Sequence, residues 1–262
     1  MNGQPSERRS RAYLSALGTT QLHLRNPWII AFFSFSFPGF GYLMLERYLV
    51  AFIFIGWEVF INTKSNINAG ILYTLLGDFE RAKQLLDERW LILYVSIYLY
   101  NIWDSYRLTV DLNKQYLLAD REDTPLRAFK FASTDINFLD KKNPVLALVW
   151  SVLAPGVGHL YVHKVITGFF IFGATISLIV MSNIPLAIQY TATGHFELAK
   201  KVLNMQWTLY LPSMFAFIYY DAYISAVELN KLFEKEQSKY LRQRYQDPAF
   251  PMPLPDGESP CT

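Results

Sequence analysis

The residues whose types could support chemistry lie mostly inside or beside the apolar stretches of this 262-residue sequence. Glu58 is the only carboxylate well inside such a stretch, and Asn101 stands in a later stretch of the same half. An ionisable side chain in an apolar environment is costly, so it is a candidate for a functional group on an ion or proton path. The structural alternative is a hydrogen bond between Glu58 and Asn101. We favour that alternative, because the matching positions in the second half are Thr175 and Ile218.

Two histidines suggest metal chemistry by their spacing alone. His159 and His163 are four residues apart, which can place two ligands on one face of a helix. A zinc site needs three or four protein ligands, and His23 and His195 belong to other segments. We therefore expect interfacial polar residues, with no metal and no cofactor.

Two acidic positions recur at the ends of apolar stretches. Asp104 and Tyr106 match Asp221 and Tyr223 in the second half. Such membrane-boundary residues could form an ion site, or they could cap and pair structurally, for example Asp104 with Arg107 or Arg47. We favour the structural role, because boundary charges usually remain hydrated.

These recurrences reflect a long internal repeat. The stretch 26–114 matches 143–231 at a fixed offset of 117 residues without a gap, and roughly a third of the aligned positions are identical. A fixed offset of this length indicates a duplication. The shared motifs include Ser-Asn-Ile, Leu-Asn-Lys and a Pro-Gly-x-Gly motif, formed by Pro38, Gly39, Gly41, Pro155, Gly156 and Gly158.

The Pro-Gly-x-Gly motif interrupts the first apolar segment of each half. Proline removes a backbone donor and bends a helix, while glycine permits a tight turn and close backbone approach. Helices broken at matching positions of two repeats mark binding sites in transporters. The same break also explains a simple hairpin, and we favour this packing role.

Composition indicates a membrane protein. The chain is 52% hydrophobic, 16% aromatic and 18% charged, with the apolar residues gathered in blocks. A net charge of +2 without a dense basic run gives no indication of nucleic-acid binding. Cys261 is the single cysteine, so no intramolecular disulfide can form. Familiar catalytic motifs are absent, and we predict that the protein is not an enzyme.

We predict an all-α polytopic bundle, integral to the cell membrane and made of two homologous repeats of about 89 residues. Each repeat has three apolar segments and an amphipathic interfacial helix, at 66–89 and 187–203. The predicted order is a basic mobile N-tail with a possible short helix near Tyr13–Leu17 (1–25), repeat 1 (26–114), a polar linker (115–142), repeat 2 (143–231), and a charged helix with a Pro-rich disordered C-tail (232–262).

The distribution of Lys and Arg distinguishes two topologies. If each Pro-Gly-broken segment re-enters, the chain crosses four times and 18 of its 24 basic residues lie inside. If these segments span, the chain crosses six times, its halves are inverted and 14 basic residues lie inside. The positive-inside rule favours parallel halves with both tails in the cytoplasm.

The segments Asn-Pro…PGFGYLMLERYLVAFIF and Asn-Pro…PGVGHLYVHKVITGFFIF resemble a bacterial membrane hairpin, the two-transmembrane-helix domain family, over roughly 20–63 and 137–180. The usual His-Arg-Phe-Tyr corner of that family is replaced here by Tyr-Leu-Met-Leu-Glu-Arg and His-Leu-Tyr-Val-His-Lys. The resemblance implies a membrane location and little chemistry.

Together these features predict a non-enzymatic membrane scaffold or partner-binding protein. Its expected partners are the lipid bilayer and a protein that contacts the linker or the C-tail. The alternative is a small transporter or channel with its path between the repeats.

Overall fold

The computed structural model describes residues 12–15, 18–122 and 140–246, and these residues are helical apart from one β-hairpin. Strands β1 (Ala12–Ser15) and β2 (Gly18–Gln21) pair antiparallel where the sequence suggested a mobile tail with a short helix. Consecutive β-branched threonines after Gly18 favour the extended conformation. Residues 1–11 of the predicted tail lie outside the described residues.

The described helices of the two halves have matching boundaries. The first half contains α1 (Pro27–Ser36), α2 (Phe40–Met44), α3 (Tyr48–Ser65), α4 (Ile67–Leu75), α5 (Phe79–Leu85) and α6 (Glu88–Arg121). The second contains α7 (Pro144–Leu153), α8 (Val157–Tyr161), α9 (Val165–Met181), α10 (Ile184–Ala192), α11 (Phe196–Val202), α12 (Met205–Thr208) and α13 (Leu211–Tyr245). Each of α1 to α6 begins 117 residues before its counterpart among α7 to α12.

The last helix differs between the halves. In the second half it is divided into α12 and α13, with Pro212 in the first turn of α13. Val95 occupies the matching position of α6, which is continuous. Proline lacks the backbone donor that a helix interior requires, so its presence explains why a new helix begins here.

The Pro-Gly-broken segment of each half folds back on itself. Arg25, which precedes α1, donates a hydrogen bond to the carbonyl of Met44 at the end of α2, and it lies 3.9 Å from the carboxylate of Glu46. In the second half, the backbone N–H of Asn143 donates to the hydroxyl of Tyr161 at the end of α8, at 3.1 Å. The start and the end of each segment therefore lie side by side.

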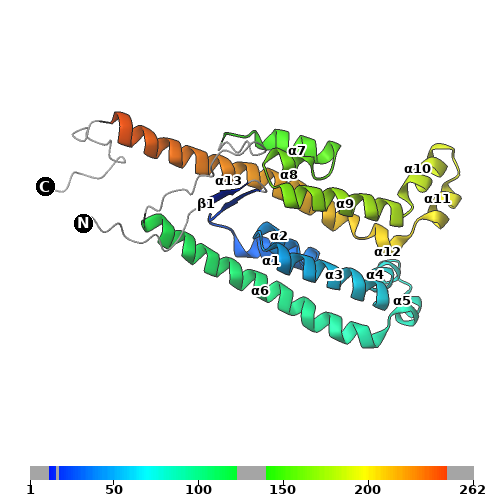
Figure 1. Cartoon of the computed structure of the whole chain (residues 1–262). Helices are drawn as coiled ribbons and strands as arrows, with labels where there is room; N and C mark the ends of the chain where they lie inside the picture. Colours follow the sequence, from blue (N-terminus) through cyan, green and yellow to red (C-terminus); the bar gives the residue numbers. More distant parts are fainter. Residues whose placement is uncertain (1–11, 16–17, 123–139, 247–262) are drawn as a thin grey trace, which may run out of the picture.

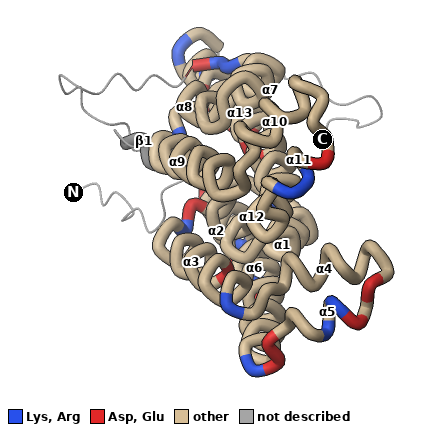
Figure 2. The backbone as a smooth tube through the Cα atoms, turned by 90° about the vertical axis from the view of Figure 1, so that its right-hand side faces the viewer, with Lys and Arg blue, Asp and Glu red and all other residues tan. Residues whose placement is uncertain are grey.

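The stretch predicted as one amphipathic helix per half is a pair of short helices. Gly77 (φ +79°) separates α4 from α5, and Gly194 (φ +79°) separates α10 from α11. A residue at positive φ ends a helix, and glycine adopts it without steric cost. Figure 2 shows charged residues on α5 and α11, while α4 and α10 carry none.

The long helices determine the overall shape. In Figure 1, α3 and α9 run in the same direction, and α6 and α13 run back in the opposite direction. The short helices α4, α5, α10 and α11 gather at one end of the bundle. Helix α6 continues into the predicted linker, and α13 includes the predicted charged helix up to Tyr245. The rest of the predicted Pro-rich tail, 247–262, lies outside the described residues.

Large apolar side chains are exposed on several helices. Examples are Phe35 on α1, Ile53 on α3, Ile92 on α6 and Phe169 on α9, each 58% to 74% exposed. Within the described ranges no single helix has both the length and the apolar character to cross a membrane, whereas α9 and α10, which meet at a 57° bend, satisfy that test together.

Candidate functional site

Asn101 supplies hydrogen bonds to the backbone on both sides of Pro38, where the helix is broken. Its side-chain amide donates to the carbonyl of Ser34 at 2.9 Å, and its carbonyl oxygen accepts from the N–H of Gly39 at 3.3 Å. Ser34 precedes Pro38 by four residues, so its carbonyl is the one that the missing proline N–H would have satisfied. From the neighbouring helix α6, the side chain of Asn101 therefore makes the hydrogen bond that the proline nitrogen cannot make.

We expect the substitution Asn101→Ile to destabilise the protein by about 2 kcal/mol, because it leaves two buried backbone groups without partners. Isoleucine is chosen because Ile218 occupies the matching position in the second half. Thermal unfolding of the purified protein in detergent measures the change. The exposed position Ser96, one and a half turns earlier in α6, supplies the control Ser96→Ile. Equal melting temperatures for the two variants would contradict this role.

Glu58 does not pair with Asn101, which corrects the hydrogen bond suggested by the sequence. Asn101 bonds Ser34 and Gly39 instead. Oε1 of Glu58 accepts a hydrogen bond from Asn62 at 2.9 Å. Asn62 also accepts from Gln206 of the second half at 2.7 Å, and Asn68 donates to the Gln206 carbonyl at 2.8 Å. Glu58, 3% exposed, thus belongs to a polar network that joins the two halves near α4 and α12.

The Asp104 carboxylate ties α2 to α6. The hydroxyl of Tyr42 donates to Asp104 at 2.7 Å, and Arg107 pairs with the same carboxylate at 2.7 Å. The ring of Tyr106 packs edge-on against Trp28, with 5.0 Å between centroids. Asp104 and Tyr106 therefore hold α6 against the Pro-Gly-broken segment.

Asp221 forms a corresponding but more deeply buried cluster. Asp221 is 1% exposed, and both of its oxygens accept from the ammonium of Lys164 at 3.1 and 3.2 Å. Nε2 of His159 lies 3.2 Å from the same carboxylate. The boundary residue of the second half is thus a buried ionic group, whereas a hydrated boundary charge was expected. Tyr223, two residues on, is 41% exposed.

The histidine pair forms no metal site in the described ranges, where no group of three or more His, Cys, Asp or Glu could hold an ion. His159 lies on α8 and is fully buried against Asp221. His163 follows that helix with φ +62°, so the two side chains do not share a helical face. The positive φ at this corner is shared with Glu46 of the first half.

The glycines of the Pro-Gly-x-Gly motif lie where helices approach closely. Gly39 (φ +100°) begins α2, and a Cβ there would lie 2.7 Å from the carbonyl oxygen of Ala51 on α3. Gly156 has φ +96° and faces the carbonyl oxygen of Gly168 on α9. Gly41 and Gly158 lie against the preceding helices α1 and α7. Pro38 and Pro155 precede these turns, so the motif positions three consecutive helices in each half.

One residue that the sequence did not single out acts in the same way in both halves. The side chain of Asn113 accepts from the N–H of Arg25 at 2.9 Å and donates to its carbonyl at 2.8 Å. Asn230 makes the same two bonds with the backbone of Lys142, at 2.7 and 2.6 Å. The recurring Leu-Asn-Lys motif was the available signal, because its asparagine matches at the offset of 117 residues.

A cavity of about 210 Å³ lies between the halves, where the start of α1 and the corner after α2 face the middle of α13. Its lining combines apolar residues with ionisable side chains from both halves: His23, Arg25, Glu46, Lys164, Asp221 and Glu228. Comparison with models of protein families, with curated proteins and with solved structures gives no match. The cavity is therefore assessed from its own chemistry.

Burial controls the electrostatics of this cavity. Removal from water, with the nearby Arg25 guanidinium as the next cause, lowers the pKa of His23 to about 2. Its imidazole is consequently neutral at physiological pH, and Nε2 accepts a hydrogen bond from Nε of Arg25 at 3.1 Å. The sequence placed His23 and Arg25 in a mobile tail, so their burial was not foreseen.

Proposed function

We propose that this chain is an integral membrane scaffold or partner-binding protein that is not an enzyme. It is built from two homologous halves that lie parallel, with both tails and the linker in the cytoplasm. Each half enters the bilayer through a re-entrant Pro-Gly-broken segment and then crosses twice. The observation that carries the scaffold function is the aromatic packing between the halves, which separates the polar network at Gln206 from the cavity.

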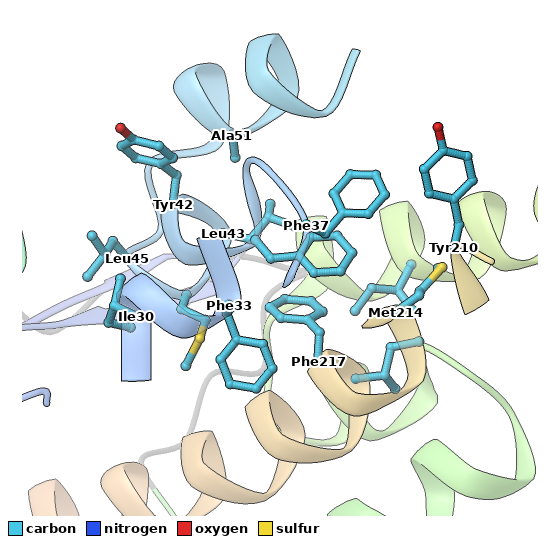
Figure 3. Packing of buried hydrophobic residues seen from close by; sticks show 14 residues of the cluster. Ile30, Phe33, Phe37, Tyr42, Leu43, Leu45, Ala51, Tyr210, Met214 and Phe217 are labelled. Atoms are coloured by element: carbon cyan, nitrogen blue, oxygen red, sulfur yellow. The ribbon is translucent and has the colours of Figure 1, made fainter. Parts of the chain in front are cut away.

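This packing joins α1 and α2 to α13. The rings of Phe37 and Phe40 stack at 4.5 Å between centroids, and Phe40 stacks on Phe217 at 4.4 Å. Phe37 also contacts Tyr210 at 5.4 Å. Figure 3 shows Phe217 directed from α13 towards the labelled rings of the first half. A transport path would have to run continuously from the polar network at Gln206 to the cavity, and the closely packed aromatic contact interrupts that route.

Exposed apolar surface supports a membrane location. The long helices present large hydrophobic side chains outward over much of their length, and soluble monomers rarely expose contiguous apolar patches of great extent. Helices α1, α7 and α9 carry no charged residue, and the charges of α13 begin only at Asp221. Other charged residues lie on α5 and α11, as Figure 2 shows. This distribution fits a bundle whose middle lies in hydrocarbon.

The projecting end of α13 supports partner binding. In Figure 1 this end extends beyond α7. It carries Tyr240, Leu241 and Tyr245, which are 55%, 48% and 72% exposed, among many charged residues. Exposed aromatic residues with a polar surround are typical of protein-binding surfaces. We therefore include the end of α13, together with the linker, in the proposed partner-binding region.

The matching helix boundaries and the repeated asparagine bonds support duplication. They also fit the hairpin of the two-transmembrane-helix family, in which an apolar helix, a Pro-Gly turn and a second apolar helix follow one another. We include this relationship in the proposal, with the membrane location that it implies.

Flux measurements on proteoliposomes test the scaffold function against the transporter alternative. We expect ion and proton leak to equal that of protein-free vesicles, for the native protein and for Glu58→Gln and Pro38→Ala. A different result would favour a transporter and overturn the scaffold function: the native protein conducts ions or protons, and Glu58→Gln or Pro38→Ala abolishes this flux although the variant still inserts. The exposed variant Glu80→Gln is the matched control for loss of a carboxylate.

A further inference from the structure

The corner residue Glu46 holds a carboxylate oxygen that lacks a donor. Glu46 follows α2 with φ +59°, its side chain is 6% exposed, and it lines the cavity between the halves. Oε1 lies 3.9 Å from Arg25, too far for a hydrogen bond, and buried Oε2 has no hydrogen-bond partner among the described residues. An unpaired buried acceptor is costly, so this oxygen is suited to a donor from a bound molecule.

The charged wall of the cavity favours a cation. Three carboxylates, those of Glu46, Asp221 and Glu228, face the two cations Arg25 and Lys164. His23 adds no positive charge, because burial keeps its pKa at about 2. Glu228 pairs with Lys231 at 2.7 Å and Asp221 pairs with Lys164 at 3.1 Å, whereas Glu46 lies 3.9 Å from Arg25, so Glu46 is the lining carboxylate with the weakest cationic partner.

The remaining lining limits the kind of cation. Ile29, Ile30, Val162 and Ile224 give the cavity an apolar wall, and the 55% exposed Leu24 lies at its rim. Apolar groups suit a short hydrocarbon body better than a hydrated metal ion. A volume of about 210 Å³ fits a small molecule.

We propose that the cavity binds a small organic ammonium ion, whose N–H group donates to Oε2 of Glu46. The ammonium group could belong to a free primary amine or to the ethanolamine headgroup of a phospholipid, since both present the same chemistry. This site goes beyond the scaffold function. Because both halves line the cavity, the bound ion would stabilise their contact.

The test uses the full-length protein in phosphatidylcholine nanodiscs, because the choline headgroup has no N–H donor. Ethylammonium chloride is titrated while the melting temperature is followed. We expect a saturable rise with the native protein. Glu46→Gln should weaken the apparent affinity about tenfold or more, because it removes the negative charge that strengthens the hydrogen bond to an ammonium group. The exposed variant Glu80→Gln should bind like the native protein.

A second variant keeps the test independent of Glu46. Ile224→Trp fills the cavity and retains every charge, so we expect it to lose the response to ethylammonium. This variant decides the matter if Glu46→Gln does not fold. The proposal is overturned if ethylammonium gives no saturable rise in the melting temperature of the native protein. It is also overturned if Glu46→Gln or Ile224→Trp shows an equal rise, or if sodium acetate causes the same rise in the native protein.

Nanodiscs that contain phosphatidylethanolamine distinguish the two sources. If the lipid supplies the ammonium group, this lipid should raise the melting temperature of the native protein but not that of Glu46→Gln, and added ethylammonium should raise it no further. If a free amine is the ligand, the response to ethylammonium should be equal in both kinds of nanodisc. Either pattern supports an ammonium site.

Discussion

Lys164→Met is expected to destabilise the protein by about 3–5 kcal/mol, because it leaves the carboxylate of Asp221 buried without its ammonium partner. Asp221 is 1% exposed, and Lys164 lies within 3.2 Å of both of its oxygens. The ring of His159 remains 3.2 Å from the carboxylate but supplies no ammonium group. Thermal unfolding in detergent should show a correspondingly large fall in melting temperature.

The first half supplies a matched control for this substitution. Arg107 pairs with the equivalent Asp104, but its side chain is 54% exposed. Arg107→Met should therefore lower the melting temperature far less than Lys164→Met, because water screens an exposed pair. The double variant Lys164→Met with Asp221→Asn should recover much of the lost stability, because no buried charge remains unpaired. Equal effects of Lys164→Met and Arg107→Met would contradict the buried pair.

Gly158→Ala is expected to cost about 3 kcal/mol, at the upper end of the penalty for overpacking. A methyl group there would overlap the hydroxyl of Ser151 and the carbonyl oxygen of Ala147 on α7. A backbone group in a helix cannot move aside as a flexible side chain can. The measurement is again the unfolding of the purified variant.

The control for this substitution is Gly173→Ala on the adjacent helix α9. Nothing lies within 4 Å of a Cβ at Gly173. Alanine should therefore stabilise this helix by about 0.5–1 kcal/mol through its higher helix propensity. If Gly158→Ala lowers the free energy of unfolding and Gly173→Ala raises it, the effect at Gly158 comes from the loss of close packing and is not a general effect of adding a methyl group. A similar small effect at both positions would show that α7 and α8 do not approach as described.

The helical class and the break at each Pro-Gly-x-Gly motif could be anticipated from local chemistry. Proline and glycine have strong backbone preferences, so Pro38 and Gly39 marked a turn before any partner was known. The break at Gly77 was concealed, because apolar residues at Leu75 and Phe79 continue the helical spacing across it. Local pattern alone could not distinguish one helix from two there.

Little of the candidate site could be predicted from the sequence. Asn101 bonds Ser34, 67 residues earlier, so its role depends on how α1 packs against α6. Arg25 lies in a stretch whose composition suggested a mobile tail, and its burial depends on the second half of the chain. Single-sequence patterns describe neighbours along an element, whereas these contacts join distant elements.

The sidedness of the linker tests the central claim, two parallel halves with re-entrant Pro-Gly-broken segments. In a Cys261→Ser background, Thr124→Cys reports on the linker and Glu80→Cys on α5 at the opposite end of the bundle. Intact cells are treated with a membrane-impermeant thiol reagent, with permeabilised cells as the reference. We predict that Glu80→Cys reacts in intact cells and that Thr124→Cys reacts only after permeabilisation. Labelling of Thr124→Cys in intact cells would contradict the parallel arrangement and favour inverted halves with six crossings.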